Sequence, residues 1–133
     1  MPLHNPMNLF LVEDDALFAM LLKRILKKIG FEHPLSIFEN GQDILDYLKE
    51  HKADAERLPD VLLLDINMPI MDGWQFLDAF EELKTTLPKQ PVIYILSSSI
   101  FTQDIEKSKE YKTVTDYLIK PLGKEKLKEI VML

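Results

Sequence analysis

The 133-residue sequence contains no cysteine and no excess of positive charge. Without cysteine, neither a disulfide scaffold nor a thiolate metal site can form. The 22 Asp and Glu residues outnumber the 16 Lys and Arg residues, and the formal net charge at pH 7 is -6. A chain with this charge repels a phosphate backbone, so we do not expect it to bind nucleic acid directly.

A targeting signal and a membrane segment are also missing from the sequence. Its first residues, MPLHNPMN, have neither the basic start nor the long apolar core of a signal peptide. No apolar run approaches the roughly 18 residues that suggest a membrane-spanning helix. We therefore expect a cytoplasmic location and no membrane partner.

The remaining composition is that of an ordinary globular protein, with 47% hydrophobic and 29% charged residues. There are no internal repeats or low-complexity stretches. The length suits one domain over residues 1–133, with a single core that buries about 70% of the unfolded surface.

Short apolar runs alternate with helix signals along the chain. The expected strands cover about residues 8–12, 33–38, 61–64, 92–96 and 116–119. Asn40 is expected to cap a second helix that runs to about Lys49, and a third helix ends before Pro88. The first helix follows the helical period at apolar positions 18, 21, 22, 25, 26 and 29. A polar surface helix is expected over about residues 103–111, and a last helix carries Leu127, Ile130 and Val131.

This alternation predicts an α/β fold with a parallel sheet covered by helices on both faces. Parallel strands need a crossover connection, and the helices supply it. In open sheets of this kind, functional residues gather beyond the carboxyl ends of the strands. Polar residues that follow different strands are therefore expected to be neighbours in space.

Such polar residues follow four of the expected strands. They are Glu13, Asp14 and Asp15 after the first, Asp65 after the third, Ser97 after the fourth and Lys120 after the fifth. At about 5 Å and an effective dielectric near 20, each carboxylate pair repels by roughly 3 kcal/mol, so the cluster predicts a cation site. Because all the candidate ligands are oxygens, we expect Mg²⁺, for which Mn²⁺ could substitute.

The same residues suggest phosphoryl transfer to a carboxylate. Asp65 is a competent nucleophile, the metal and Lys120 can neutralise developing charge, and Ser97 offers a hydroxyl to the new group. Helix capping is the simpler interpretation of any single residue, and it suits Asp15 and Ser99. It does not explain the joint occurrence, because capping requires no lysine and disfavours packed acids.

The residues Glu13-Asp14, Asp65, Ser97 and Lys120-Pro121, together with the segment DINMPIMDGWQFL, resemble the receiver domain of two-component response regulators. We therefore predict a flavodoxin-like, doubly wound (βα)5 fold with strand order 2-1-3-4-5. The resemblance implies a bacterial phosphorelay protein that accepts phosphate from a histidine kinase or histidine phosphotransfer protein. It is not expected to be an enzyme beyond self-phosphorylation and slow autodephosphorylation.

The resemblance also assigns roles to individual residues. It implies that Asp65 is the phosphoacceptor, and that the metal is held by Glu13, Asp14, Asp65 and the backbone carbonyl of Asn67. It implies phosphate-binding or switch roles for Lys120, Ser97 and Tyr117. The interval from Ser97 to Lys120 is one residue longer than is common in the family, so Ser98 is an alternative to Ser97.

Partner contacts are predicted at two places. On a helical wheel, Ala16 and Met20 lie opposite the face of Phe18, Leu22, Ile25 and Ile29, and we expect them to dock the kinase or phosphotransfer protein. A downstream target is expected on the surface of the fourth helix, fifth strand and fifth helix. The sequence suggests a stand-alone receiver.

Three alternative interpretations compete with this one. A haloacid-dehalogenase-type phosphatase would need a second aspartate two residues after its nucleophile, where this chain has Asn67. A flavodoxin-type cofactor module would place phosphate beside Glu13, Asp14 and Asp15, which repel it. The third is a degenerate receiver that acts only as a phosphorylation-independent adaptor.

Overall fold

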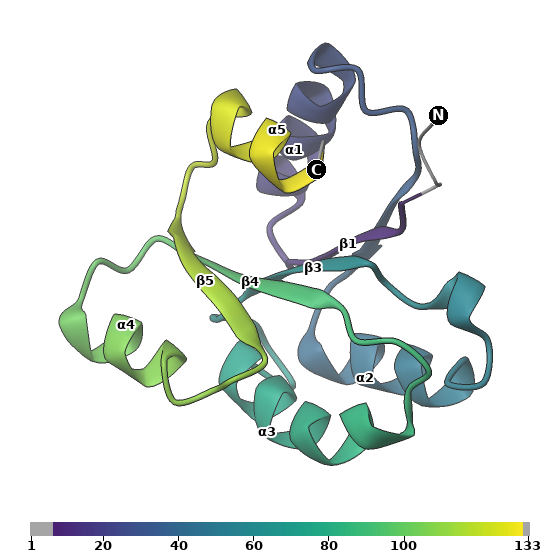
Figure 1. Cartoon of the computed structure of the whole chain (residues 1–133). Coiled ribbons are helices and arrows are strands. Elements are labelled where there is room, and N and C mark those ends of the chain that lie inside the picture. The colour runs from purple at the N-terminus through teal and green to yellow at the C-terminus, as the bar shows by residue number, and fades with distance from the viewer. Residues whose placement is uncertain (1–6, 132–133) are drawn as a thin grey trace.

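The computed structural model describes residues 7–131, which form a parallel five-stranded sheet between two helical layers (Figure 1). The strand order is β2-β1-β3-β4-β5, which confirms the predicted flavodoxin-like topology. The strands are β1 (Leu9–Val12), β2 (Leu35–Phe38), β3 (Val61–Asp65), β4 (Val92–Ser97) and β5 (Val114–Ile119). The α-helices are α1 (Ala16–Lys28), α2 (Gly41–Glu50), α3 (Gly73–Leu83), α4 (Thr102–Ser108) and α5 (Lys124–Val131).

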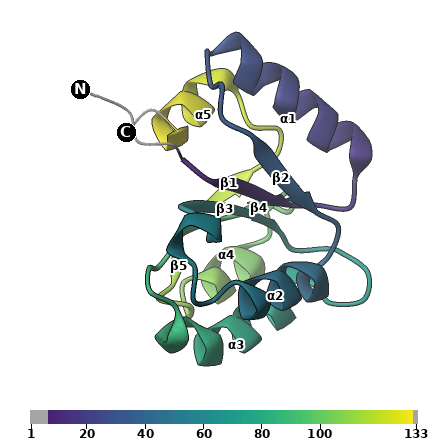
Figure 2. The same cartoon turned by 90° about the vertical axis from the view of Figure 1, so that its right-hand side faces the viewer.

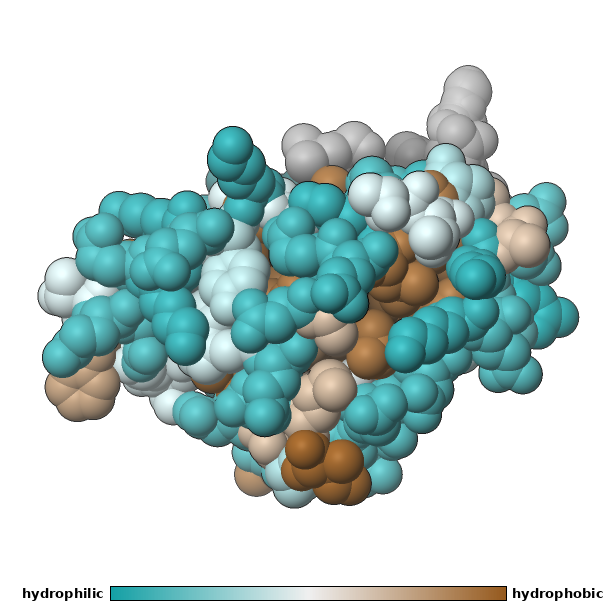
Figure 3. Space-filling model, turned by 90° about the horizontal axis from the view of Figure 1, so that it is seen from below, coloured by the Kyte–Doolittle hydropathy of each residue, from teal (hydrophilic) through white to brown (hydrophobic). Residues whose placement is uncertain are grey.

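The helices divide between the two faces of the sheet. Helices α1 and α5 cover one face, and α2, α3 and α4 lie on the other (Figure 2). Seen from the side of α2, α3 and α4, the surface is largely hydrophilic, as expected when amphipathic helices turn their apolar faces inward (Figure 3). Within residues 7–131, no helix has the length and apolar character that crossing a membrane requires.

The central strands are buried because helices cover both of their faces. Along β1, Leu9 and Leu11 pack with the helices α1 and α5, whereas Phe10 and Val12 pack into the opposite core with α2 and α3. All five residues of β3 are buried as well. The uninterrupted apolar runs of these two strands therefore correspond to the centre of the sheet.

Helix α1 begins earlier than its apolar period suggested. Asp15 is its N-cap, and the Asp15 carboxylate accepts hydrogen bonds from the amides of Leu17 and Phe18 at 2.9 and 3.2 Å. The buried face of α1 centres on Ala19, Leu22 and Leu26. The prediction that Leu21 belongs to this face was wrong, because its side chain is 45% exposed.

Helix α4 is shorter than predicted and ends at Ser108. Its buried residues include only Ser108, so the helix has little apolar surface with which to hold a further turn. The prediction that it lies on the surface is confirmed. Strand β2 likewise starts at Leu35, directly after Pro34, which cannot donate a backbone hydrogen bond to the sheet.

Gly73, the first residue of α3, lies against the end of β3. An added Cβ at this position would be 2.6 Å from the carbonyl oxygen of Asp65 and 2.9 Å from the Cα of Ile66. Both contacts are with backbone, which cannot rotate away as a side chain can. The start of α3 can therefore approach the strand that carries Asp65 only without a side chain at residue 73.

We predict that Gly73→Ala destabilises the protein by about 1–3 kcal/mol, because the methyl group must push α3 away from β3. Chemical denaturation measures the change. Gly123→Ala is the matched control, since an added Cβ there meets nothing within 4 Å. The control should change stability by less than about 1 kcal/mol, and an equal loss in both variants would contradict the close-approach explanation.

Candidate functional site

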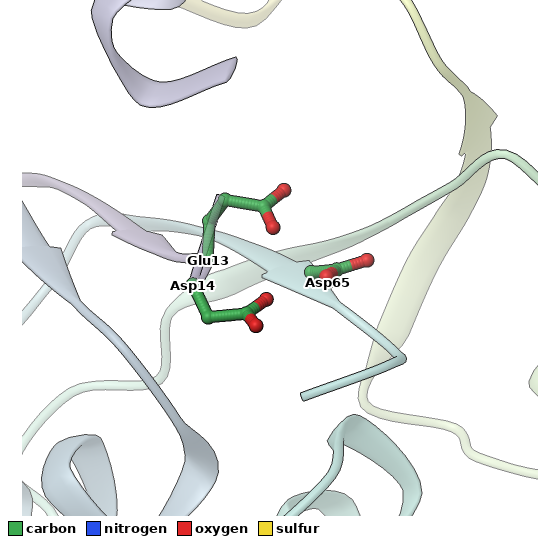
Figure 4. Close-up of side chains that lie close together, drawn as sticks. All are labelled: Glu13, Asp14 and Asp65. Atoms are coloured by element: carbon green, nitrogen blue, oxygen red, sulfur yellow. The ribbon is translucent and has the colours of Figure 1, made fainter. Parts of the chain in front are cut away.

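The carboxyl ends of β1 and β3 bring the predicted acids together. Val12 pairs with Leu64, so the residues that follow them, Glu13 and Asp65, lie side by side. Carboxylate oxygens of Glu13, Asp14 and Asp65 all lie within 4.8 Å of one another (Figure 4). Glu13 and Asp65 are buried, at 2% and 5% exposure, and Asp14 is exposed. The structure therefore places these three predicted site residues in one cluster.

Lys120 is the cation of the cluster. Its backbone amide donates to the carbonyl of Ser97 at 2.8 Å, which fixes the residue just beyond the end of β5. From there the Lys120 Nζ lies 2.5 Å from Glu13 Oε1 and 3.3 Å from Asp65 Oδ1. Only 18% of the lysine side chain is exposed. One ammonium thus bridges two buried carboxylates that come from different strands.

Burial and like charge act on the ionisation of these groups. Burial raises the pKa of the Glu13 carboxyl to about 7, an effect that the hydrogen bond from Lys120 opposes and the charge of Asp65 reinforces. Burial lowers the pKa of Lys120, but the hydrogen bond to Glu13 and the charge of Asp65 outweigh it, so the net shift is upward. Lys120 is charged, and its single positive charge does not fully compensate the negative charge of the clustered carboxylates.

Ser97 and Ser98 differ in their surroundings. Ser97 is 2% exposed at the end of β4, next to the Leu96 that pairs with Asp65, whereas Ser98 is exposed. The Oγ of Ser97 accepts a hydrogen bond from the amide of Ser99 at 3.0 Å. The alternation of side chains therefore puts Ser97, and not Ser98, on the buried side of the strand end.

The predicted switch residue Tyr117 is half-buried in β5 and contacts the same loop. Its hydroxyl donates to the carbonyl of Ser99 at 2.9 Å. Ser99 does not cap α4 as sequence reasoning suggested, because the N-cap residue is Phe101. Instead, Ser99 joins Ser97 on one side to Tyr117 on the other, a connection that no sequence pattern indicated.

Strand β5 contains a bulge in the interval between Ser97 and Lys120. Ile93 pairs with Val114, but Tyr94 pairs with Asp116, so Thr115 is an additional residue in the strand. Beyond this bulge the register is regular up to the end of the ladder. With the bulge, Lys120 still lies beside the end of β4, where its amide bonds to the Ser97 carbonyl.

The remaining predicted residues lie around the cluster. Asn67 is exposed, two residues after Asp65. Ala16 and Met20 are exposed on α1, as predicted, but Leu17 is exposed on the same helix at 60%. The apolar surface of α1 is therefore larger than the two residues that the helical wheel selected.

Phe18 is a site residue that sequence reasoning assigned only to the core. The Lys120 Nζ lies over its ring, 4.5 Å from the ring centroid. This distance is within the range of a cation–π interaction. The helical period correctly placed Phe18 toward the protein interior, but a period along one helix contains no information about a lysine 102 positions later.

The family model of the response regulator receiver domain matches residues 9–132. The chain belongs to this family, and it is therefore a receiver domain of the two-component response regulators. It is 34% identical over 128 residues to the probable methanogenesis regulatory protein FilR2 of Methanothrix harundinacea, and the match covers 96% of this chain and 80% of FilR2. It is 36% identical over 112 residues to the transcriptional regulator NtrC of Escherichia coli, covering 84% of this chain but only 21% of NtrC.

Solved response regulators share the fold. A two-component response regulator from Cytophaga hutchinsonii has a TM-score of 0.83 at 25% identity, over 96% of this chain and 95% of that one. The phosphorylated cyanobacterial phytochrome response regulator RcpA has a TM-score of 0.76 at 30% identity, over 96% and 89%. The Mn²⁺-bound form of response regulator Rcp1 has a TM-score of 0.73 at 27% identity, over 95% and 89%. Divalent metal binding thus occurs in this family, whose domains are regulatory.

We predict that in EDTA the variant Asp14→Asn is more stable than the wild type by about 1 kcal/mol. The substitution removes one negative charge from the acidic cluster, and the exposure of Asp14 reduces the gain below the roughly 3 kcal/mol of a full pair repulsion. Thermal unfolding without metal measures the difference.

The matched control is Asp15→Asn, which removes the same charge one residue away. Asparagine caps helices as well as aspartate, so α1 keeps its N-cap. We expect the control to change stability by less than about 0.5 kcal/mol. An Asp14→Asn variant no more stable than this control would show that the acids do not repel appreciably.

Proposed function

We propose that Asp65 accepts a phosphoryl group from a histidine kinase or a histidine phosphotransfer protein. The observation that carries this proposal is the position of the buried Asp65 carboxylate, 3.3 Å from the Lys120 ammonium and beside Glu13 and Asp14. The family membership and the phosphorylated form of RcpA support it. Self-phosphorylation and slow autodephosphorylation are the reactions that we expect.

Contacts within the site suggest which oxygen reacts. The amide of Ile66 donates to Asp65 Oδ1 at 2.9 Å, and Lys120 approaches the same oxygen. We therefore assign Oδ2 as the nucleophile. It forms a bond to phosphorus while the bond from phosphorus to the donor nitrogen breaks, and that nitrogen keeps the electron pair. Lys120 neutralises charge on the transferred oxygens.

We further propose Mg²⁺ as the resident cation, with Mn²⁺ as a substitute. Its ligands would be Glu13, Asp14, Asp65 and the backbone carbonyl of Asn67. The donor set fits a hard divalent ion, because the clustered side-chain ligands are all carboxylate oxygens and carry more charge than one lysine neutralises. When bound, Mg²⁺ would stabilise negative charge on the transferring phosphoryl group. The Mn²⁺-bound form of Rcp1 is consistent with this choice.

Two surfaces would connect the site to its partners in the cytoplasm. We propose that Ala16 and Met20, both exposed on α1, contact the phosphodonor protein. A downstream target would bind the surface formed by α4, β5 and α5. That residues 1–133 act as a stand-alone receiver stays a prediction.

The loop after β4 offers a route from Asp65 to that output surface. Phosphorylation adds charge and strong acceptor oxygens, and a nearby hydroxyl gains a charge-assisted bond by turning toward them. If Ser97 turns in this way, its Oγ gives up the hydrogen bond from the Ser99 amide. The carbonyl of Ser99 accepts from Tyr117, so the change reaches β5 through two adjacent hydrogen bonds.

To test the phosphoacceptor, the protein is incubated with acetyl phosphate and Mg²⁺ and analysed by mass spectrometry. We expect a base-labile gain of about 80 Da that EDTA prevents. Asp65→Asn should abolish the gain. Asp46→Asn, which alters an exposed carboxylate on α2, should not. Undiminished labelling of Asp65→Asn would overturn the assignment, and an unlabelled wild type would favour a phosphorylation-independent adaptor.

To test the switch, the ring resonances of Tyr117 are followed by NMR while beryllofluoride, a phosphoryl mimic, is added with Mg²⁺. In the wild type and in Ser98→Ala we expect the resonances to shift. In Ser97→Ala the mimic should still bind, but the Tyr117 resonances should not respond. Loss of the response in Ser98→Ala instead would assign the role to Ser98. A response in both variants would mean that neither hydroxyl operates the switch.

A further inference from the structure

The Lys120 ammonium has three contacts in the described part of the chain. Two are carboxylates, Glu13 Oε1 at 2.5 Å and Asp65 Oδ1 at 3.3 Å. The third is the face of the Phe18 ring, whose centroid lies 4.5 Å from Nζ. The aromatic face is the only one of the three that is uncharged and takes no part in the proposed chemistry.

The two carboxylates have other tasks in the proposed reaction. Both belong to the acidic cluster that suits a divalent cation, so a bound cation competes with Lys120 for their charge. Asp65 also loses a free oxygen when it becomes phosphorylated. Neither carboxylate can therefore hold the ammonium in the same way through the whole reaction. The Phe18 ring is not a ligand of the divalent cation, so the Lys120 ammonium can stay in contact with the ring when the cation binds.

Phe18 is well placed for such a role. It lies in the first turn of α1, and its backbone amide donates to the N-cap carboxylate of Asp15 at 3.2 Å. The segment from Glu13 to Phe18 thus supplies two acids of the cluster and the aromatic ring from one short stretch of chain. The ring is half-buried, with Leu22, Pro121 and Leu122 among the side chains that share its groove beside α1. Partial removal from water strengthens the attraction between a cation and an aromatic face.

We propose that Phe18 is a positioning residue, which holds the Lys120 ammonium over Asp65 through a cation–π interaction while the carboxylates exchange partners. This inference rests on the proposed function, since it assumes that Lys120 acts on the phosphoryl group. The ring does not touch the reacting atoms. The ring restricts the conformations of the Lys120 side chain, so that its positive charge lies beside Asp65 when the phosphoryl group arrives.

The experiment replaces Phe18 by phenylalanines with one, two and three ring fluorines. Fluorine withdraws electron density from the ring face, and thus weakens its attraction for a cation, with little change in side-chain shape. The initial rate of labelling by acetyl phosphate at saturating Mg²⁺ is measured for each protein. We expect the rate to fall stepwise, by roughly two- to tenfold over the series. Labelling of Phe18→Leu, which has no aromatic ring, should be at least as slow as labelling of the trifluorinated protein. Labelling of Phe18→Trp, which keeps an aromatic face, should be about as fast as labelling of the wild type.

The matched control is the same fluorine series at Phe31, a buried phenylalanine that packs in the same core layer as α1. Lysine contacts with an aromatic face among the described residues involve Phe18 and Trp74, and not Phe31. Fluorination at Phe31 should leave the labelling rate unchanged. Equal rates across the Phe18 series, or an equal fall in the Phe31 series, would reduce Phe18 to a packing residue and overturn the inference.

A second measurement does not depend on phosphorylation. In metal-free protein, and again with Mg²⁺ present, NMR is used to detect nuclear Overhauser effects between the ε-methylene protons of Lys120 and the ring of residue 18. We expect them in both conditions for Phe18. Their loss on addition of Mg²⁺ would contradict the inference. A wild type that shows these contacts but accepts no phosphate would instead refute only the proposed function.

Discussion

The contact of one lysine with two buried acids is the interaction on which the site depends. Glu13 and Asp65 lie inside the protein, where an unpaired carboxylate would be strongly unfavourable. Lys120 reaches both, and without it the ends of β1 and β3 would repel each other. Removing one partner of a buried ion pair commonly costs several kcal/mol, although such a pair adds little stability relative to an apolar core. The contribution of this contact is therefore mainly to the charge of the site and not to the stability of the fold.

The stability of the fold comes instead from the two apolar layers on either side of the sheet. The buried strands β1 and β3 have no polar side chain between their first residues and their carboxyl ends, where the acids begin. Like charges can be concentrated at this edge because the packing of the strands does not depend on them. The parallel order of the strands then brings residues from four chain segments to the same edge.

Much of this arrangement could be predicted from the sequence. An apolar run that ends in an acid or a lysine marks the carboxyl end of a strand, so the sequence predicts strand-end positions for Glu13, Asp65 and Lys120, and the structure has them there. What could not be predicted depends on contacts between elements. The bulge at Thr115 is set by the pairing of β5 with β4, and the contact of Phe18 with Lys120 requires the packing of α1 beside the end of β5. Neither has a local sequence signal, because each depends on residues far away in the chain.

The excess of negative charge also bears on how phosphorylation of Asp65 would affect the rest of the protein. Phosphorylation of Asp65 would add about one further negative charge to a cluster that one lysine already fails to neutralise. Nearby groups with a mobile proton or dipole can reorient toward this added charge. The Ser97 hydroxyl is such a group, because it is buried next to the site. The Ser97 Oγ accepts a hydrogen bond from the Ser99 amide, and the Ser99 carbonyl accepts one from the Tyr117 hydroxyl. If this strand-end hydroxyl changed its partner on phosphorylation, it would therefore alter a contact of β5, the last strand in the sheet order of the described residues.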